Sequence, residues 1–228
     1  MAGLRYKTLR ENIVEEIRLR IVNQELPPGA KIVEMELAKE FETSRAPIRE
    51  ALRQLENEGL VEYIRNAGCS VKDITVKDAY EIYLMRSNYE TLAVKVMNGN
   101  IPEETIESME RILEKMKGID EDHYLDVFKF DNQLHGELVK MVNLPRLYKA
   151  WEVLNYGNVI TSRTKNLEKS KVVKRQYSRH KELVDACREG DCEKLCELIR
   201  AHYWRTIKRL LEEEGEPEES VYEWNFPV

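Results

Sequence analysis

The sequence TSRAPIREALRQLENEGLV at Thr43–Val61 predicts an amphipathic helix with two stripes of side chains. At about 100° per residue, one stripe is apolar and a second, roughly a quarter-turn away, is cationic. The apolar residues are Ile48, Ala51, Leu52 and Leu55, and the cationic ones are Arg45, Arg49 and Arg53. Ser44 is placed to cap the helix through its hydroxyl, and Pro47 falls in the first turn, where its missing N–H costs nothing. One face of the helix is therefore anchored in a core, and the adjacent face is free to bind an anion.

The segments before this helix predict the rest of a helix-turn-helix. Three arginines on one helix face are by themselves more often a solvated surface than a binding surface. However, EMELAKEF (34–41) predicts a short helix that a tight turn joins to the arginine helix. Before it, Tyr6–Val22 predicts a supporting amphipathic helix, which a Pro-Pro-Gly run at 27–29 terminates. This arrangement favours insertion of the arginine helix into the major groove of DNA.

The segment after the arginine helix predicts a β-hairpin, or wing. LVEYI (60–64) and SVKDI (70–74) flank Asn66-Ala67-Gly68, a glycine-containing loop that suits two antiparallel strands. Arg65 would then lie at the tip and Lys72 on the return strand. Both could meet backbone phosphates or the minor groove.

The run PPGAKI (27–32), then EMELAKEF, then SRAPIREALRQLENEGLV resembles the winged-helix domain of the GntR family of bacterial transcription regulators, over about residues 5–74. The resemblance implies that the arginines matching Arg45 and Arg49 read guanine edges and phosphates, and that Gly68 lies against the minor groove. The residues expected to contact DNA are Ser44, Arg45, Arg49, Arg53, Arg65 and Gly68. Met35 departs from the pattern, because some relatives carry a DNA-contacting arginine there.

Length and charge suggest two domains with different partners. The chain has 228 residues, 42% of them hydrophobic, and the predicted boundary separates residues 1–74 from 75–228. The net charge is −6, and residues 1–74 contribute twelve Lys/Arg against thirteen Asp/Glu. We therefore expect modest non-specific DNA affinity, set by the local cationic stripe. No long apolar run and no signal peptide are found, so a cytoplasmic protein without membrane contact is expected.

Beyond the boundary every segment has a helical period, which makes the protein mainly α: a winged helix-turn-helix of three helices and a β-hairpin, then an antiparallel all-helical bundle. Six helices are predicted in this second part, at about 76–98, 102–117, 121–142, 145–167, 171–189 and 191–213.

Polar side chains lie on the inward faces of these helices. Asp131 and His135 interrupt the apolar stripe of the third helix, while His180 and His202 point inward from two later ones, and His123 does not. A single core histidine is more often a hydrogen-bonded packing residue than a metal ligand. Three histidines and a carboxylate directed at one interior favour a divalent metal instead. Three nitrogens and one oxygen suit Zn²⁺, Ni²⁺, Co²⁺, Mn²⁺ or Fe²⁺, with zinc or nickel favoured.

Residues 78–208 resemble the FCD ligand-binding domain of the FadR subfamily of GntR regulators. Its metal-binding members carry Asp-x-x-x-His on one helix and one histidine on each of two later helices, which matches Asp131, His135, His180 and His202. Six helices place the chain nearer the VanR-like branch. The resemblance implies a homodimer with its main contacts in this domain, and a small carboxylate such as lactate or citrate at the metal.

Two further residues are candidates for the ligand pocket. Arg86 is predicted to face inward, and a buried guanidinium requires an anionic partner, either Asp131 or a ligand carboxylate. Asn158 shares a face with apolar residues and could add a hydrogen bond.

The interpretation favoured by these patterns is a ligand-responsive, metal-containing transcription regulator, expected to be a repressor, that binds a palindromic double-stranded DNA operator as a homodimer. The alternative is a metal-dependent hydrolase, because Asp131 and the three histidines could activate water. That alternative lacks an obvious general base beside the metal set, and it leaves the winged helix unexplained.

Overall fold

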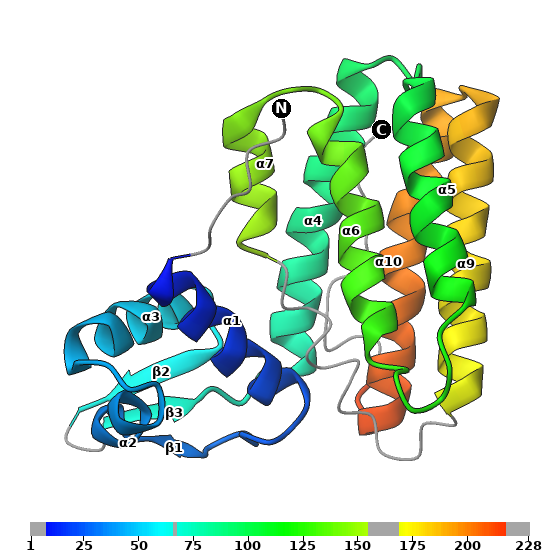
Figure 1. Ribbon diagram of the computed structural model, residues 1–228. Coiled ribbons are helices and arrows are strands. Elements are labelled where there is room, and N and C mark those ends of the chain that lie inside the picture. The colour runs from blue at the N-terminus through cyan, green and yellow to red at the C-terminus, as the bar shows by residue number, and fades with distance from the viewer. Residues whose placement is uncertain (1–7, 66–67, 155–168, 218–228) are drawn as a thin grey trace. The chain divides into compact units, whose positions relative to one another are not determined.

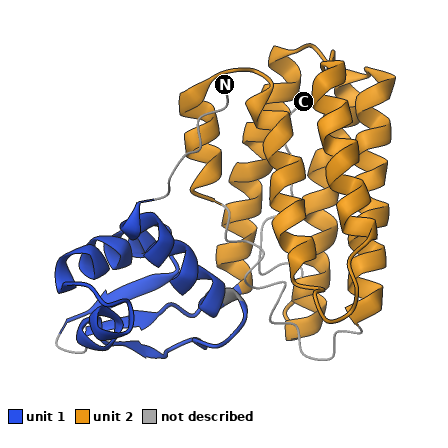
Figure 2. Ribbon diagram, viewed as in Figure 1, with its two compact units in different colours: residues 1–75 blue, residues 76–228 orange. Residues whose placement is uncertain are grey.

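The computed structural model describes residues 8–65, 68–154 and 169–217, and the chain divides into two compact units. The first unit is Met1–Thr75 and the second is Val76–Val228 (Figure 2). As predicted, the protein is mainly α, with strands only in the first unit among the described residues.

The first unit is a winged helix-turn-helix (Figure 1). Its elements are α1 (Leu9–Val22), β1 (Lys31–Ile32), α2 (Glu34–Glu40), α3 (Arg45–Asn57), β2 (Val61–Ile64) and β3 (Gly68–Val71). The three strands form an antiparallel sheet in the order β1-β3-β2. The short strand β1 was not predicted, because two residues are too few to show an alternating pattern.

The core of this unit forms where α3 packs on α1. The apolar stripe predicted for α3 is confirmed, since Ile48, Ala51, Leu52 and Leu55 are all buried. Two details of the helix starts differ from the prediction. Ser44 occupies the N-cap of α3, but its side chain makes no capping hydrogen bond. Helix α1 begins at Leu9, three residues later than predicted, because Thr8 and Glu11 form a reciprocal capping box there.

The wing differs from the prediction in its register. Its return strand was predicted at 70–74, but β3 begins at Gly68, which pairs with Ile64 of β2. Gly68 has φ +89°, a conformation that glycine adopts without strain. Lys72 therefore follows the return strand instead of lying on it.

The second unit is a helical bundle. Its described helices are α4 (Val76–Val96), α5 (Glu103–Lys117), α6 (Asp126–Lys140), α7 (Pro145–Glu152), α9 (Lys169–Glu189) and α10 (Cys192–Glu214). Helix α4 packs against α10, α6 and α7, and α5 packs against α6 and α9 (Figure 1). None of the described helices combines the length and apolarity that crossing a membrane requires.

Two of the predicted helix boundaries are wrong. Helix α6 begins at Asp126, not near 121, because Asp120 accepts hydrogen bonds from the backbone and ring of His123 and holds a turn there. Helix α7 ends at Glu152, whereas the pattern predicted a helix to 167. Residues 155–168 lie outside the described part, so the six-helix assignment to a VanR-like branch stays a prediction.

A close backbone approach joins the turn after α4 to the turn between α9 and α10. Gly99 has φ +76°, and a Cβ built on it would lie 2.7 Å from the carbonyl oxygen of Gly190. Only glycine fits this position, because any side chain would collide with backbone. The contact fixes one end of the helical unit.

Candidate functional site

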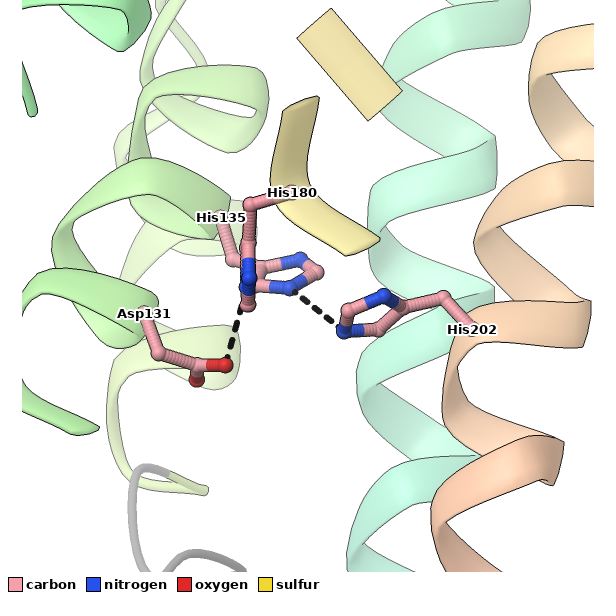
Figure 3. A group of neighbouring side chains, drawn as sticks. All are labelled: Asp131, His135, His180 and His202. Atoms are coloured by element: carbon pink, nitrogen blue, oxygen red, sulfur yellow. Dashed lines mark hydrogen bonds and ion pairs between the residues drawn. The ribbon is translucent and has the colours of Figure 1, made fainter. Parts of the chain in front are cut away.

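Three helices of the second unit bring four potential metal ligands together. Asp131 and His135 lie one turn apart on α6, His180 comes from α9 and His202 from α10 (Figure 3). All four residues are buried, and one ligand atom from each lies within 4.8 Å of the others. The structure therefore assembles all four residues of the predicted metal set.

The donor atoms of the four side chains lie in two close pairs. His180 Nε2 lies 2.9 Å from Asp131 Oδ1, yet this buried nitrogen has no partner aligned for a hydrogen bond. His135 Nε2 and His202 Nε2 are 3.2 Å apart (Figure 3). Ligand atoms about 2.1 Å from one metal ion are about 3 Å apart when they are neighbours on an octahedron. The donor spacing therefore fits a divalent ion.

Hydrogen bonds on the far side of two rings set their tautomers. His180 Nδ1 donates to the carbonyl oxygen of Gln176 at 2.7 Å, since a carbonyl can only accept. His135 Nδ1 lies 2.7 Å from Glu90 Oε2 and donates to it in the same way. Each ring then presents the lone pair of Nε2 to the cluster. This arrangement of outer partners is typical of metal-binding histidines.

The charges within the cluster also suit a cation. Burial lowers the pKa of His202 well below its usual value, and the neighbouring His180 and His135 lower it further, so the ring is neutral. Burial alone would raise the pKa of Asp131, but His180, His135 and Arg86 outweigh that effect and keep the carboxylate ionised. Imidazole nitrogens and a carboxylate oxygen are the donor atoms that a divalent transition metal prefers.

Glu90 on α4 is the central residue that the sequence analysis missed. It is fully buried, and its Oε1 accepts hydrogen bonds from Trp151 Nε1 at 2.8 Å and from the Tyr203 hydroxyl at 2.6 Å. Its Oε2 accepts from His135. Burial would raise the pKa of Glu90, but His135, Arg86 and Tyr203 lower it, so the carboxylate is ionised. We call Glu90 with these four partners the Glu90 network.

Arg86 is the cation of this network and is 1% exposed. Its Nη1 donates to Asn132 Oδ1 at 2.7 Å, its Nε to the Tyr203 hydroxyl at 3.1 Å, and its guanidinium lies 4.5 Å from the centre of the Trp151 ring. Glu90 Oε1 is 3.9 Å from Arg86 Nε. The prediction that Arg86 is buried is thus confirmed, and Glu90 is a carboxylate partner that the prediction of Asp131 or a ligand carboxylate did not include. Asn158, the other predicted ligand residue, lies outside the described residues.

The residues predicted to contact DNA lie on the outside of the first unit. Ser44, Arg45, Arg49 and Arg53 are exposed at one side of α3, while Arg65 and Gly68 are exposed in the wing. Met35 on α2 is also exposed. A cleft of about 370 Å³ is lined by Glu34, Arg49, Arg53, Glu56 and Tyr63. The cationic stripe of α3 therefore opens onto a cleft that also holds two carboxylates.

The comparisons with known proteins cover both units. Residues 9–71 match the family model described as bacterial regulatory proteins, gntR family, and residues 81–205 match the FCD domain model. The uncharacterized HTH-type transcriptional regulator YdhC of Bacillus subtilis is 40% identical over 100 residues, which are 44% of this chain and 45% of that protein. The gluconate operon transcriptional repressor of Bacillus licheniformis is 27% identical over 82% of this chain and 79% of its own length.

A similar fold is found among solved structures. A GntR transcriptional regulator from a Rhodococcus species superposes with a TM-score of 0.73 at 20% identity, covering 89% of this chain and 97% of that one. At this identity the likeness concerns the fold alone. It extends over both the winged-helix and the helical unit.

Proposed function

Because the chain belongs to the GntR family of bacterial regulatory proteins and carries an FCD domain, we propose that it is a repressor whose binding to a palindromic operator responds to a small carboxylate. Members of this family are DNA-binding transcription regulators and not enzymes, so the hydrolase alternative is not supported. Glu90 accepts hydrogen bonds from His135, Trp151 and Tyr203, which assigns it a supporting role beside the cluster.

The observation that carries the sensing part of the proposal is the orientation of the histidine rings. His180 Nε2 presents a lone pair to the Asp131 carboxylate oxygen 2.9 Å away, and two such acceptors repel unless a proton or a cation lies between them. Asp131, His135, His180 and His202 would hold a divalent transition metal, with zinc or nickel favoured. When bound, such an ion offers further coordination positions to an anionic ligand.

A small carboxylate is the effector class that this site suits. The name of the Bacillus licheniformis relative refers to gluconate, a sugar acid, and that repressor aligns with most of this chain. Arg86 was predicted to bind the effector directly. It donates through Nε to Tyr203 and through Nη1 to Asn132, which uses two of its five N–H groups. Asn158 stays a predicted ligand contact.

Chain connectivity suggests how the effector signal reaches DNA. Helix α4 begins at Val76, directly after the first unit, and it packs on α6 and α10, which carry three of the four metal ligands. An acid that completes the coordination shell can change how these helices pack. In a homodimer, a shift of α4 changes the spacing of the two α3 helices against half-sites about one DNA turn apart. Coupling of this kind is typically about 1–3 kcal/mol.

The decisive test removes the metal ligands and leaves the DNA-binding unit unaltered. We expect a His180→Ala/His202→Ala variant that retains its helical circular dichroism to bind operator DNA without responding to gluconate, lactate or citrate. Native mass spectrometry should find two subunits and a bound metal in the wild type, and two subunits without metal in the variant. His123→Ala is the matched control, because His123 is an exposed histidine outside the cluster.

Two results would count against the proposal. If the metal-free variant responds to the effector as the wild type does, the metal has only a structural role. If the wild type is a monomer at micromolar concentration, with and without DNA, the palindromic mode of reading is wrong.

A further inference from the structure

Glu34, the first residue of α2, holds two arginines of the DNA-reading helix α3 at once. Its Oε1 and Oε2 accept hydrogen bonds from Arg49 Nε at 3.2 Å and Arg49 Nη2 at 2.9 Å. Arg45 Nη2 donates to the same Oε2 at 3.2 Å, and the Tyr63 hydroxyl of β2 donates to Oε1 at 3.4 Å. We call this arrangement the Glu34 bridge. It forms one wall of the cleft between α2, α3 and β2.

The bridge joins a sheltered carboxylate to exposed cations. The Glu34 side chain is 16% exposed, whereas those of Arg49 and Arg45 are 49% and 61% exposed. The hydrogen bond from Arg49 is the main reason that the pKa of Glu34 is lowered, so the carboxylate is ionised at neutral pH. Arginine has a long, flexible side chain, and two simultaneous hydrogen bonds to a fixed acceptor restrict its guanidinium to one orientation.

The bridge leaves one particular edge of Arg49 available to a ligand. A guanidinium has five N–H donors, one on Nε and two on each Nη. Glu34 uses the side edge formed by Nε and Nη2, so the end edge formed by Nη1 and the second Nη2 hydrogen remains. A guanine in the major groove presents O6 and N7, which accept two parallel hydrogen bonds from one arginine edge. Only end-on recognition of guanine is compatible with the bridge.

We infer that Glu34 is a positioning residue that sets the base specificity of Arg49, an inference that rests on the proposed DNA-binding function. Glu34 makes no contact with DNA in this arrangement and acts through the guanidinium. It also reduces the net charge of the three groups from +2 to +1. Non-specific binding depends on the number of phosphate charges that the protein neutralises. Glu34 therefore weakens non-specific binding while it orients Arg49 for one base pair.

The test compares an operator with random DNA for variants that alter charge and geometry separately. The operator is first selected by the wild-type chain from a pool of random duplexes, and the guanine read by Arg49 is located as the position at which Arg49→Ala loses discrimination. Affinities for the operator, for the operator substituted at that base pair and for a random duplex are then measured at several salt concentrations. Glu34→Gln keeps the side-chain shape but removes the charge, and Glu34→Asp keeps the charge but shortens the reach.

We expect Glu34→Gln to bind the random duplex more tightly than the wild type does. The slope of log affinity against log salt concentration should become steeper by about one. The ratio of the affinity for the operator to that for the random duplex should fall at least about 10-fold. Base discrimination should be lost only at the base pair read by Arg49. Glu34→Asp should lower the same ratio without changing the salt dependence. Glu36→Gln is the matched control, since it removes the same charge from an exposed position of α2, and it should leave the ratio unchanged.

The outcomes separate this inference from the function on which it rests. If the wild type enriches no sequence from the pool, the DNA-binding function and the role of Glu34 fail together. If a sequence is enriched but Glu34→Gln and Glu36→Gln change the ratio equally, only the positioning role fails. The role also fails if Glu34→Gln still alters base discrimination in an Arg49→Ala background, because its effect would then not pass through Arg49.

Discussion

Glu90 in α4 and Glu34 in α2 each bind an arginine and a tyrosine hydroxyl, but they do so in different environments. Glu90 and Arg86 are at most 1% exposed, and their partners are buried or half-buried side chains. The arginines bound to Glu34 are about half exposed or more. Inside the bundle water cannot replace a lost partner, whereas at the surface of the first unit it can. The same residue types therefore make a solvent-excluded network in one unit and a solvent-exposed one in the other.

The energetic difference follows from desolvation. Removing one partner of a buried ion pair leaves an uncompensated charge, which is strongly destabilising. An exposed pair contributes about 0–1 kcal/mol, because water and salt compete for both groups.

Glu90→Ala should have the largest effect. It removes the anion beside Arg86 and the acceptor for Trp151, Tyr203 and His135. We expect a loss of about 3–5 kcal/mol in the free energy of unfolding, measured by guanidinium chloride denaturation. Glu182→Ala removes an exposed partner of Arg205 in the same unit and should cost no more than about 1 kcal/mol. If both variants lost the same free energy of unfolding, burial would not explain a difference in stability between buried and exposed ion pairs.

Glu90→Gln should have a smaller effect, seen in metal affinity. The amide keeps the shape of the side chain, but it is a weaker acceptor for the Nδ1–H of His135. Loss of such an outer partner typically weakens metal binding about 10- to 100-fold, which competition with a chelator can measure. Glu137→Gln on α6 is the control, since Glu137 pairs only with Lys140 among the described contacts. If Glu90→Gln bound the metal as tightly as the wild type, the hydrogen bond from His135 to Glu90 would not contribute to metal affinity.

Arg49→Ala should affect DNA binding without affecting stability. Loss of a two-bond contact to one base should weaken operator binding about 5- to 150-fold and relax specificity at that base pair, as fluorescence anisotropy can show. Arg188→Ala is a matched control, because Arg188 is an exposed arginine bound to Glu110 and Glu103 in the helical unit. Operator affinity unchanged by Arg49→Ala would contradict the assignment of α3 to the major groove.

Glu34→Gln should have the smallest effect on folding. Arg49 lowers the pKa of Glu34, so any stability from the ionised carboxylate is present above its unfolded pKa of 4.5 and is lost as the pH falls through the lowered value. At neutral pH we expect the thermal midpoint of the variant to stay within about 3 °C of the wild type, because the arginine partners are exposed. A much larger shift in differential scanning calorimetry would mean that the bridge supports the fold as well as recognition.

The sequence indicated the burial of the candidate metal ligands but not that of Glu90, which bonds to one of them. Asp131 and His135 interrupt a clear apolar stripe, so their burial follows from helical spacing. Glu90 lies four residues after Arg86, a spacing that is typical of an exposed ion pair on a helix surface. Helix α4 also carries apolar residues on its exposed side, such as Val96, which is 53% exposed. The sequence pattern therefore does not distinguish the buried face of α4 from the exposed one. Tyr83 and Val94 lie at helical spacing from Glu90 and share its face, and both are buried. Their spacing is the sequence signal that could have indicated the burial of Glu90.

In the first unit, the amphipathic helix α3 was predictable from the sequence and the Glu34 bridge was not. The stripe of α3 follows from periodicity within one segment. The bridge instead depends on how α2 and β2 lie against α3, because Glu34 is 15 residues from Arg49 and Tyr63 is 29 residues from Glu34. Local patterns carry no information on such contacts. The register of the wing was missed for the same reason, since it depends on the pairing of Gly68 with Ile64.

The Glu90 network also bears on the order in which a newly made chain acquires its structure. Tyr203 follows Glu90 by 113 residues, and at about 5–20 residues per second its synthesis comes on the order of ten seconds later. Every partner of Glu34 has been made by Tyr63. All residues of the first unit are therefore available to fold before synthesis of the second unit is complete.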